Sequence, residues 1–369
     1  MQRPQLHATL WPEFSHFNQF QNDSRMAGIR LNSAMAESDA LGQSVERLSN
    51  QQVVPWYVDF KGRQPRVEEV IPDPHNLVLR LNHPIETRLP VGVAFKAEKD
   101  FAILDRLEEN GRKLIFRGGP NFNVRKGESL HIKDPSFKIR IPGSIFSDQE
   151  KEKIAAVVGR CDKYYLSYVE TQRDVDEFRE LVGPDAFIWL KIETRDGLEY
   201  IANTFRKTDN VGLVAARGDL YIEVSRHHEI LNAMKLIISK DPEAMAASRI
   251  FLSLIGYKNP LVSYLLGLHP EDQHDPRVQD LIKPSGIPEC HDFEELAWLY
   301  DLGYRNYLLC DEICLDGELL DIALSAFEAF ADYYHTEEQT TANVVIEKNL
   351  HPGLRDRLSA SFKRIFANA

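Results

Sequence analysis

The sequence predicts an α/β protein, a (β/α)8 barrel with a small β-rich domain inserted after its third strand. Eight short apolar runs recur along the 369 residues, with polar turns and helix-like stretches between them. Eight is the number of strands that such a barrel needs. The alternation breaks only once, and the length allows one large domain and a smaller one.

The expected barrel strands are apolar on both faces, as parallel strands covered by helices are. They are residues 6–10, 28–31, 56–58, 163–168, 187–190, 211–215, 250–255 and 306–310, and the seventh could begin earlier. We therefore assign 1–66 and 142–340 to the barrel, 67–141 to the insertion and 341–369 to a C-terminal helical tail.

Within 67–141 the apolar residues follow a period of two, as in Leu77, Leu79 and Leu81, and Gly, Pro and Asn mark many turns. Only 101–109 has a helix-like repeat. An insertion at the C-terminal end of a barrel strand lies over the mouth of the barrel, where active sites of this fold are found. It could serve as a lid or as a stabilising side domain.

After the last expected strand, Asp316 can cap a helix with one apolar face. That face consists of Leu320, Ala323, Leu324, Phe327, Phe330 and Tyr334. The tail has a second apolar face, at Leu354, Leu358, Phe362 and Phe366, which favours a docked terminal helix over a membrane or partner helix.

Composition excludes several classes of function. Lys and Arg number 44 against 56 Asp and Glu, a net charge of -12, so no basic surface is expected for nucleic acid. No apolar run approaches the roughly 18 residues that span a bilayer. The N-terminus lacks a signal-peptide pattern, and the four cysteines form no Cys-x-x-Cys motif, so we expect a cytoplasmic protein. An anionic substrate would then need local cations or a metal ion.

Charged residues gather at the ends of two neighbouring expected strands. Lys191 and Glu193 are two residues apart, so both project to one face of their strand. A right-handed crossover places the next strand beside it, which brings Asp219 to the same rim. Two carboxylates there suit Mg2+, with the remaining oxygen ligands coming from substrate. The alternative is that these charges only solvate the loop ends.

The Gly218–Asp219 turn exposes backbone N–H groups. If a helix begins there, its first turn would favour a substrate carboxylate. Gly218 is therefore a candidate ligand-binding residue.

At this point the motifs resemble those of the pyruvate kinase family. K-I-E-T-x-x-G begins at Lys191, and A-R-G-D-L follows at Ala216. Further matches occur in the same order: T-L-W-P at 9–12, R-L-N at 30–32, D-F-K-G at 59–62, K-G at 126–127 and C-D-E at 310–312, near the position of S-G-E-T in that family. The resemblance covers about residues 5–335, and the C-terminal regulatory domain of the family is not expected here.

The resemblance implies an Mg2+-dependent phosphotransferase, with Mn2+ as a substitute metal. Glu193 and Asp219 match the metal ligands, and the metal would hold the enolate of phosphoenolpyruvate, pyruvate or a related 2-oxo acid. Lys191 matches the lysine beside the transferring phosphoryl group, and Arg30 matches the arginine that holds its phosphate.

Four further positions take their expected roles from the same resemblance. Asn32 and Asp59 match two ligands of a monovalent cation. Arg66 matches a phosphate-contacting arginine near the hinge of the lid. Ser248 stands where the family has a threonine that assists protonation of the enolate.

Departures from the family pattern affect the K+ and nucleotide half of the site. Ala34 and Met35 replace a serine and a histidine, and Phe60 replaces a threonine. Tyr221 replaces a glycine, and its ring is expected to reach into or over the site. The sequence thus argues against a K+ site and against efficient transfer to ADP.

Two other interpretations stay open. Metal-dependent aldolases of 4-hydroxy-2-oxo acids and β-type citrate lyases also place a glutamate, an aspartate and an arginine around a pyruvate-like enolate, so the chain could be a lyase. It could also be a degenerate paralogue that binds a metabolite or partner. The expected partner is a small molecule, with a nucleotide undecided, no nucleic acid or membrane, and a homo-oligomer conceivable.

Overall fold

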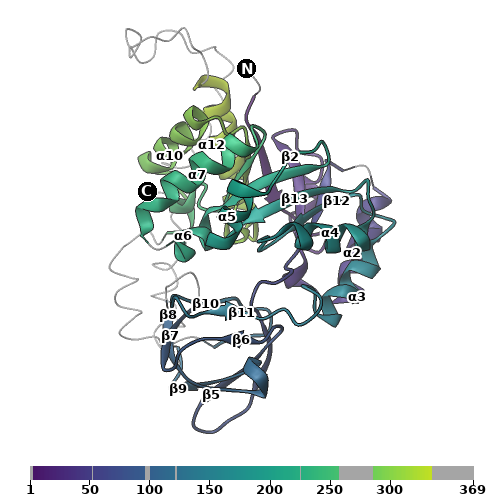
Figure 1. Cartoon of the computed structure of the whole chain (residues 1–369). Coiled ribbons are helices and arrows are strands. Elements are labelled where there is room, and N and C mark those ends of the chain that lie inside the picture. The colour runs from purple at the N-terminus through teal and green to yellow at the C-terminus, as the bar shows by residue number, and fades with distance from the viewer. Residues whose placement is uncertain are drawn as a thin grey trace, which may run out of the picture.

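The computed structural model contains a closed eight-stranded parallel barrel with a β-rich domain below it in the view of Figure 1. It describes residues 3–51, 53–95, 100–120, 123–224, 226–256 and 286–334. Strands neighbour one another in the order β1, β16, β15, β14, β13, β12, β3, β2, and β2 closes the ring on β1. The predicted fold class is confirmed.

The barrel strands begin and end close to most of the predicted runs. Their bounds are β1 Gln5–Thr9, β2 Met26–Asn32, β3 Trp56–Phe60, β12 Lys163–Leu166, β13 Phe187–Ile192, β14 Val211–Ala216, β15 Met245–Ala247 and β16 Asn306–Leu308. Seven of the eight runs overlap a barrel strand.

The run at 250–255 is wrong as a strand. The seventh strand is β15, which ends at Ala247, and the predicted run instead contains a short 3-10 helix, Leu252–Ile255. Between them Ser248, Arg249 and Phe251 have φ near +60°, a conformation that non-glycine residues rarely adopt. Ile250, Phe251 and Leu254 are buried in the main core, and this run of apolar residues resembles the pattern of a buried strand.

Helices cover the outside of the barrel. Their bounds are α1 Phe17–Phe20, α2 Ser38–Ser49, α3 Asp148–Val157, α4 Gln172–Val182, α5 Arg195–Asn203, α6 Arg217–Glu223, α7 Ile230–Lys240, α10 Cys290–Leu302, α11 Asp311–Cys314 and α12 Gly317–Tyr333. The main core lies between these helices and the strands, and a smaller aromatic-rich cluster with Tyr165, Trp189 and Met245 fills the barrel interior. No described helix is long and apolar enough to cross a membrane.

The helix predicted after the last strand is confirmed as α12. Asp316 accepts hydrogen bonds from the backbone N–H groups of Glu318 and Leu319, which satisfies two donors of the first turn. Of the predicted apolar face, all but Tyr334 are buried. The predicted tail helix at 341–369 lies outside the described residues.

The strands described in the insertion after β3 form antiparallel sheets, and one short 3-10 helix, Glu109–Gly111, follows β8. Six strands pair in the order β10, β7, β8, β9, β5, β4, and β11 pairs with β6. Their bounds are β4 Val67–Ile71, β5 Leu77–Leu81, β6 Ile85–Glu86, β7 Val91–Phe95, β8 Asp100–Glu108, β9 Lys113–Arg117, β10 Leu130–Ile132 and β11 Lys138–Ile139.

The helix-like stretch at 101–109 is therefore wrong, because it forms β8. Along β8, Ala102 and Leu104 are buried whereas Phe101 and Ile103 are exposed. Apolar side chains on both faces of the strand hide the period of two.

Side-chain contacts connect the insertion to the rim of the barrel. His131 of β10 lies with Nε2 3.3 Å from Asp219 Oδ1 and Nδ1 3.3 Å from Glu223 Oε1, both on α6. Lys126 Nζ lies 3.0 Å from Glu37 Oε1, next to α2. At the hinge, Arg66 donates to the carbonyl of Gly127 over 2.6 Å. The insertion thus lies over the mouth of the barrel.

Candidate active site

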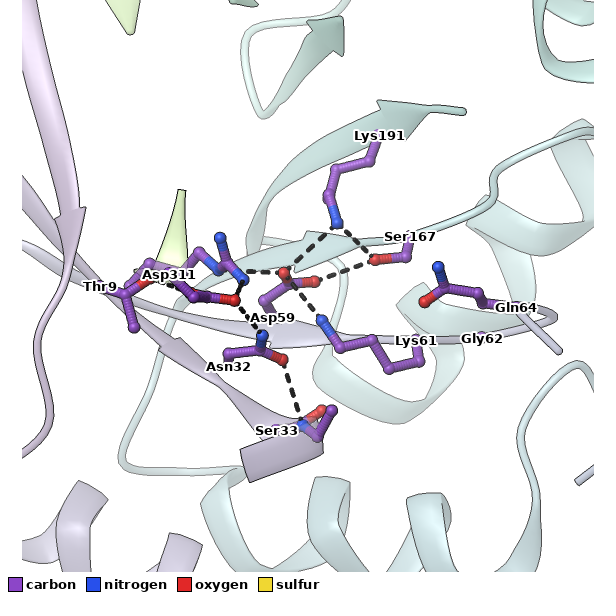
Figure 2. A network of polar contacts seen from close by, with 12 residues as sticks. Thr9, Asn32, Ser33, Asp59, Lys61, Gly62, Gln64, Ser167, Lys191 and Asp311 are labelled. Atoms are coloured by element: carbon purple, nitrogen blue, oxygen red, sulfur yellow. Dashed lines mark hydrogen bonds and ion pairs between the residues drawn. The ribbon is translucent and has the colours of Figure 1, made fainter. Parts of the chain in front are cut away.

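A network of buried charges occupies the C-terminal end of the barrel, where β2, β3 and β13 end (Figure 2). Within β3, Asp59 points into this network, whereas the next residue, Phe60, packs outward against Tyr164 and Phe178. The alternation of a strand thus separates a charged inner face from an apolar outer one.

Asp59 is the centre of the network and is fully buried. Its Oδ2 lies 3.0 Å from Lys61 Nζ, 3.1 Å from Arg30 Nε and 3.5 Å from Lys191 Nζ. Burial alone would raise the pKa of Asp59, but the three cations hold it well below its usual range. The carboxylate is therefore ionised.

Lys191 connects Asp59 to the next strand end. Its ammonium donates to Ser167 Oγ over 2.8 Å and lies 3.0 Å from Glu193 Oε1. Although burial favours the neutral amine, Asp59 and Glu193 raise the pKa of Lys191 above its ordinary value. A positive charge is thus fixed at this point of the site.

Glu193 and Asp219 lie close enough that each perturbs the pKa of the other. Burial and then the neighbouring Asp219 raise the pKa of Glu193 to about 7, against the opposing effect of Lys191. Burial would also raise the pKa of Asp219, but the hydrogen bond and the positive charge of His131 hold this pKa below its ordinary value. The convergence predicted from spacing is consistent with this coupling.

The two carboxylates fit one divalent cation. Glu193 Oε2 accepts from the Tyr168 N–H over 2.7 Å, which fixes the carboxylate, whereas the buried Oε1 has no aligned hydrogen bond. Oε1 lies 3.0 Å from the Lys191 ammonium but accepts no hydrogen bond of good geometry. A buried carboxylate oxygen of this kind, beside a second carboxylate, is a suitable ligand for Mg2+ or Mn2+. Among the described residues no group of three or more His, Cys, Asp or Glu could hold a metal, so further ligands would be water or substrate.

Asp59 and Asn32 do not fit a monovalent cation. Asp59 already faces three positive side chains. The amide of Asn32 is also engaged, since Nδ2 donates to Asp311 over 2.8 Å and Oδ1 accepts from the N–H of Ala34. This agrees with the argument from Ala34 and Phe60 against a K+ site.

The motif K-I-E-T-x-x-G has a local structural explanation. Thr194 follows Glu193 as the N-cap of α5, and its Oγ1 accepts from the Gly197 N–H over 3.1 Å. A Cβ on Gly197 would lie 2.7 Å from the carbonyl of Val169, so only glycine fits there. The cap and the glycine hold the end of β13 in place.

The remaining predicted residues lie around this network. A Cβ placed on Gly218 would lie 3.5 Å from Ser248 Oγ, so these two residues are adjacent. Arg66 uses Nε and Nη2 to bind Gln64 Oε1 at the hinge. With Lys61, Lys126 and others, Arg66 lines a pocket of about 280 Å³ between barrel and insertion.

Tyr221, expected to reach over the site, has other contacts. Its ring stacks on His227 at a centroid distance of 4.5 Å, and the Arg249 guanidinium lies 4.9 Å from the ring centre. The ring thus contacts two side chains of the barrel.

Several residues of the network are missing from the sequence prediction. Lys61 stands two residues after Asp59, the same spacing that identified Lys191 and Glu193, so strand periodicity could have found it. Asp311 lies in the C-D-E motif, but the motif did not indicate a role in the site. Ser167 and His131 gave no local signal, because their place in the site depends on how distant segments pack.

Comparison with known proteins adds independent evidence. The family profile described as "Pyruvate kinase, barrel domain" matches residues 118–251. The matched part of the barrel is thus similar to the barrel domain of pyruvate kinases.

Curated relatives show the same similarity. A pyruvate kinase of Methanocaldococcus jannaschii is 25% identical over 211 residues, covering 53% of this chain and 45% of the relative. A pyruvate kinase of Thermoplasma acidophilum is 24% identical over 265 residues, covering 64% of this chain and 46% of the relative. A pyruvate kinase of Agaricus bisporus is 30% identical over 140 residues, covering 36% of this chain and 25% of the relative. The matches thus span less than half the length of these pyruvate kinases.

Proposed function

We propose that the chain is a divalent-metal-dependent enzyme of the pyruvate kinase type, acting on phosphoenolpyruvate, pyruvate or a closely related 2-oxo acid. One observation carries this proposal. The buried Lys191 and Glu193 at the end of β13 and the partly exposed Asp219 after β14 form a mutually perturbing set at the mouth of a barrel similar to that of pyruvate kinases.

Mg2+ or Mn2+ held by Glu193 and Asp219 would supply positive charge for the carboxylate and the enolate oxygen of the substrate. The chain's own contribution begins with Lys191. Because Asp59 and Glu193 keep its ammonium charged, it stabilises negative charge that develops on the oxyacid. Ser167 fixes its position through the 2.8 Å hydrogen bond.

Two further roles belong to this proposal. The hydroxyl of Ser248, beside Gly218, would move a proton at the enolate carbon. The insertion, which reaches α6 through His131, would exclude water from the mouth of the barrel.

Isothermal titration calorimetry with oxalate, a mimic of the pyruvate enolate, tests the proposal. Oxalate should bind the wild type in Mn2+ and much more weakly without it. Glu193→Gln and Lys191→Met should each weaken binding at least about tenfold, since each removes one charge from the desolvated set. Glu243→Gln, whose side chain is 71% exposed, is the control. Metal-independent binding, or binding unchanged in Glu193→Gln, would contradict the proposal.

A further inference from the structure

Three donors from the first two barrel strands converge on the carboxylate of Asp311. Thr9 Oγ1 donates to Oδ1 over 2.6 Å, while Arg30 Nη2 and Asn32 Nδ2 donate to Oδ2 over 3.1 and 2.8 Å. Figure 2 shows Thr9, Asn32 and Asp311 meeting at one side of the Asp59 network. A guanidinium, an amide and a hydroxyl converging in this way form a typical anion-binding set.

The donors are buried, whereas the carboxylate is reachable from the mouth. Thr9, Arg30 and Asn32 are at most 7% exposed, and the Asp311 side chain is 29% exposed. Burial would raise the pKa of Asp311, but Arg30 and then the Thr9 hydroxyl hold it below its ordinary value. Asp311 is therefore an anion that already occupies this position.

Arg30 is neutralised twice. Besides Asp311, its guanidinium lies 3.1 Å from Asp59 Oδ2. A phosphoryl group that approached Arg30 would meet a fixed carboxylate at short range, in a partly desolvated site where like charges repel strongly.

We propose that Asp311 is a specificity-determining residue that fills the anion position at Arg30 and so excludes a phosphoryl group. The favoured substrate is then a 2-oxo acid without phosphate. That the substrate is a 2-oxo acid rests on the proposed function. The exclusion of a phosphoryl group rests on the geometry at Arg30 alone.

Asp311 cannot easily leave this position. It begins α11, directly after the loop that follows β16, and Ile313 and Cys314 of the same turn are buried in the core. Its carboxylate is therefore tethered beside the donors at a high effective concentration, which a free anion must overcome.

Binding of inorganic phosphate without divalent metal, measured by calorimetry on the full chain, tests the exclusion. Asp311→Asn keeps an acceptor for Arg30 and a donor for Thr9 while removing the charge, and Asp311→Gly empties the position. Each should raise phosphate affinity at least about tenfold. Glu312→Gln removes the same charge from an exposed neighbour and should leave the affinity within twofold.

A second titration compares oxalate with 2-phosphoglycolate in Mn2+. Asp311→Asn should improve 2-phosphoglycolate binding at least about tenfold and change oxalate binding less than threefold. Phosphate affinities equal in the wild type and both Asp311 variants would overturn the inference. A phosphate gain in Asp311→Asn together with no oxalate binding by the wild type would support it and refute the proposed function.

Discussion

Replacing Asp59 by asparagine should destabilise the barrel more than any exposed charge substitution. The change preserves the shape of the side chain and removes the charge that three cations share. Arg30, Lys61 and Lys191 would then be left buried without that partner, all within 3.5 Å of the lost charge.

The magnitude follows from this geometry. Removing one partner of a buried ion pair typically costs about 3–5 kcal/mol, because the remaining charge stays desolvated. Lys191 and Arg30 keep Glu193 and Asp311 as partners, which limits the loss. Lys61 can lose its proton, because its pKa is lowered to about 7, mainly by burial. We therefore expect the free energy of unfolding to fall by about 3–5 kcal/mol.

Urea denaturation followed by tryptophan fluorescence measures this loss in the barrel specifically. Trp11, Trp56, Trp189 and Trp298 all lie outside 67–141, so the insertion contributes no signal. Asp332→Asn is the matched control, because Asp332 pairs with Arg3 on the surface of the barrel and its side chain is 41% exposed. That control should change stability by less than about 1 kcal/mol. An Asp59→Asn loss below 1 kcal/mol would refute the account of a desolvated network.

Two further predictions concern packing and pH. Gly212→Ala should destabilise the barrel by about 1–3 kcal/mol or prevent folding, because a Cβ would lie 2.2 Å from the buried Trp189 ring. Urea denaturation measures this loss, and an unchanged midpoint of urea unfolding would contradict the prediction. Glu150, which accepts from the N–H groups of Lys61 and Gly62, has its pKa raised by burial from 4.5 to about 7. Its contribution to stability is therefore complete below pH 4.5 and lost as pH rises through 7. The wild type should lose about 3 kcal/mol relative to Glu150→Gln over this interval, and parallel pH profiles of the two proteins would contradict the prediction.

Much of the fold could be predicted because its strongest signals are local. Runs such as 187–190 and 211–215 are apolar on both faces, and only a strand covered on both sides explains them. The seventh strand could not be placed, because Met245–Ala247 is short and the apolar residues after it pack as a 3-10 helix. In β8, apolar side chains on both faces removed the alternation that marks a strand.

The site was predictable where two residues of one strand share a face, as Lys191 and Glu193 do. It was not predictable where function depends on segments far apart in sequence. Asp311 meets Asn32 across 279 positions, and His131 reaches Asp219 only through the folded insertion. Spacing contains no information about such contacts, because they are set by closure of the barrel and packing of the insertion.

The central claim is that Glu193 and Asp219 together hold one divalent ion beside Lys191. Electron paramagnetic resonance of Mn2+ tests it most directly, with free and bound metal counted as the full chain is titrated. We predict one bound Mn2+ in the wild type, affinity reduced at least about tenfold in Glu193→Gln and in Asp219→Asn, and wild-type affinity in Glu243→Gln. Tight Mn2+ binding that survives both Glu193→Gln and Asp219→Asn would contradict the claim.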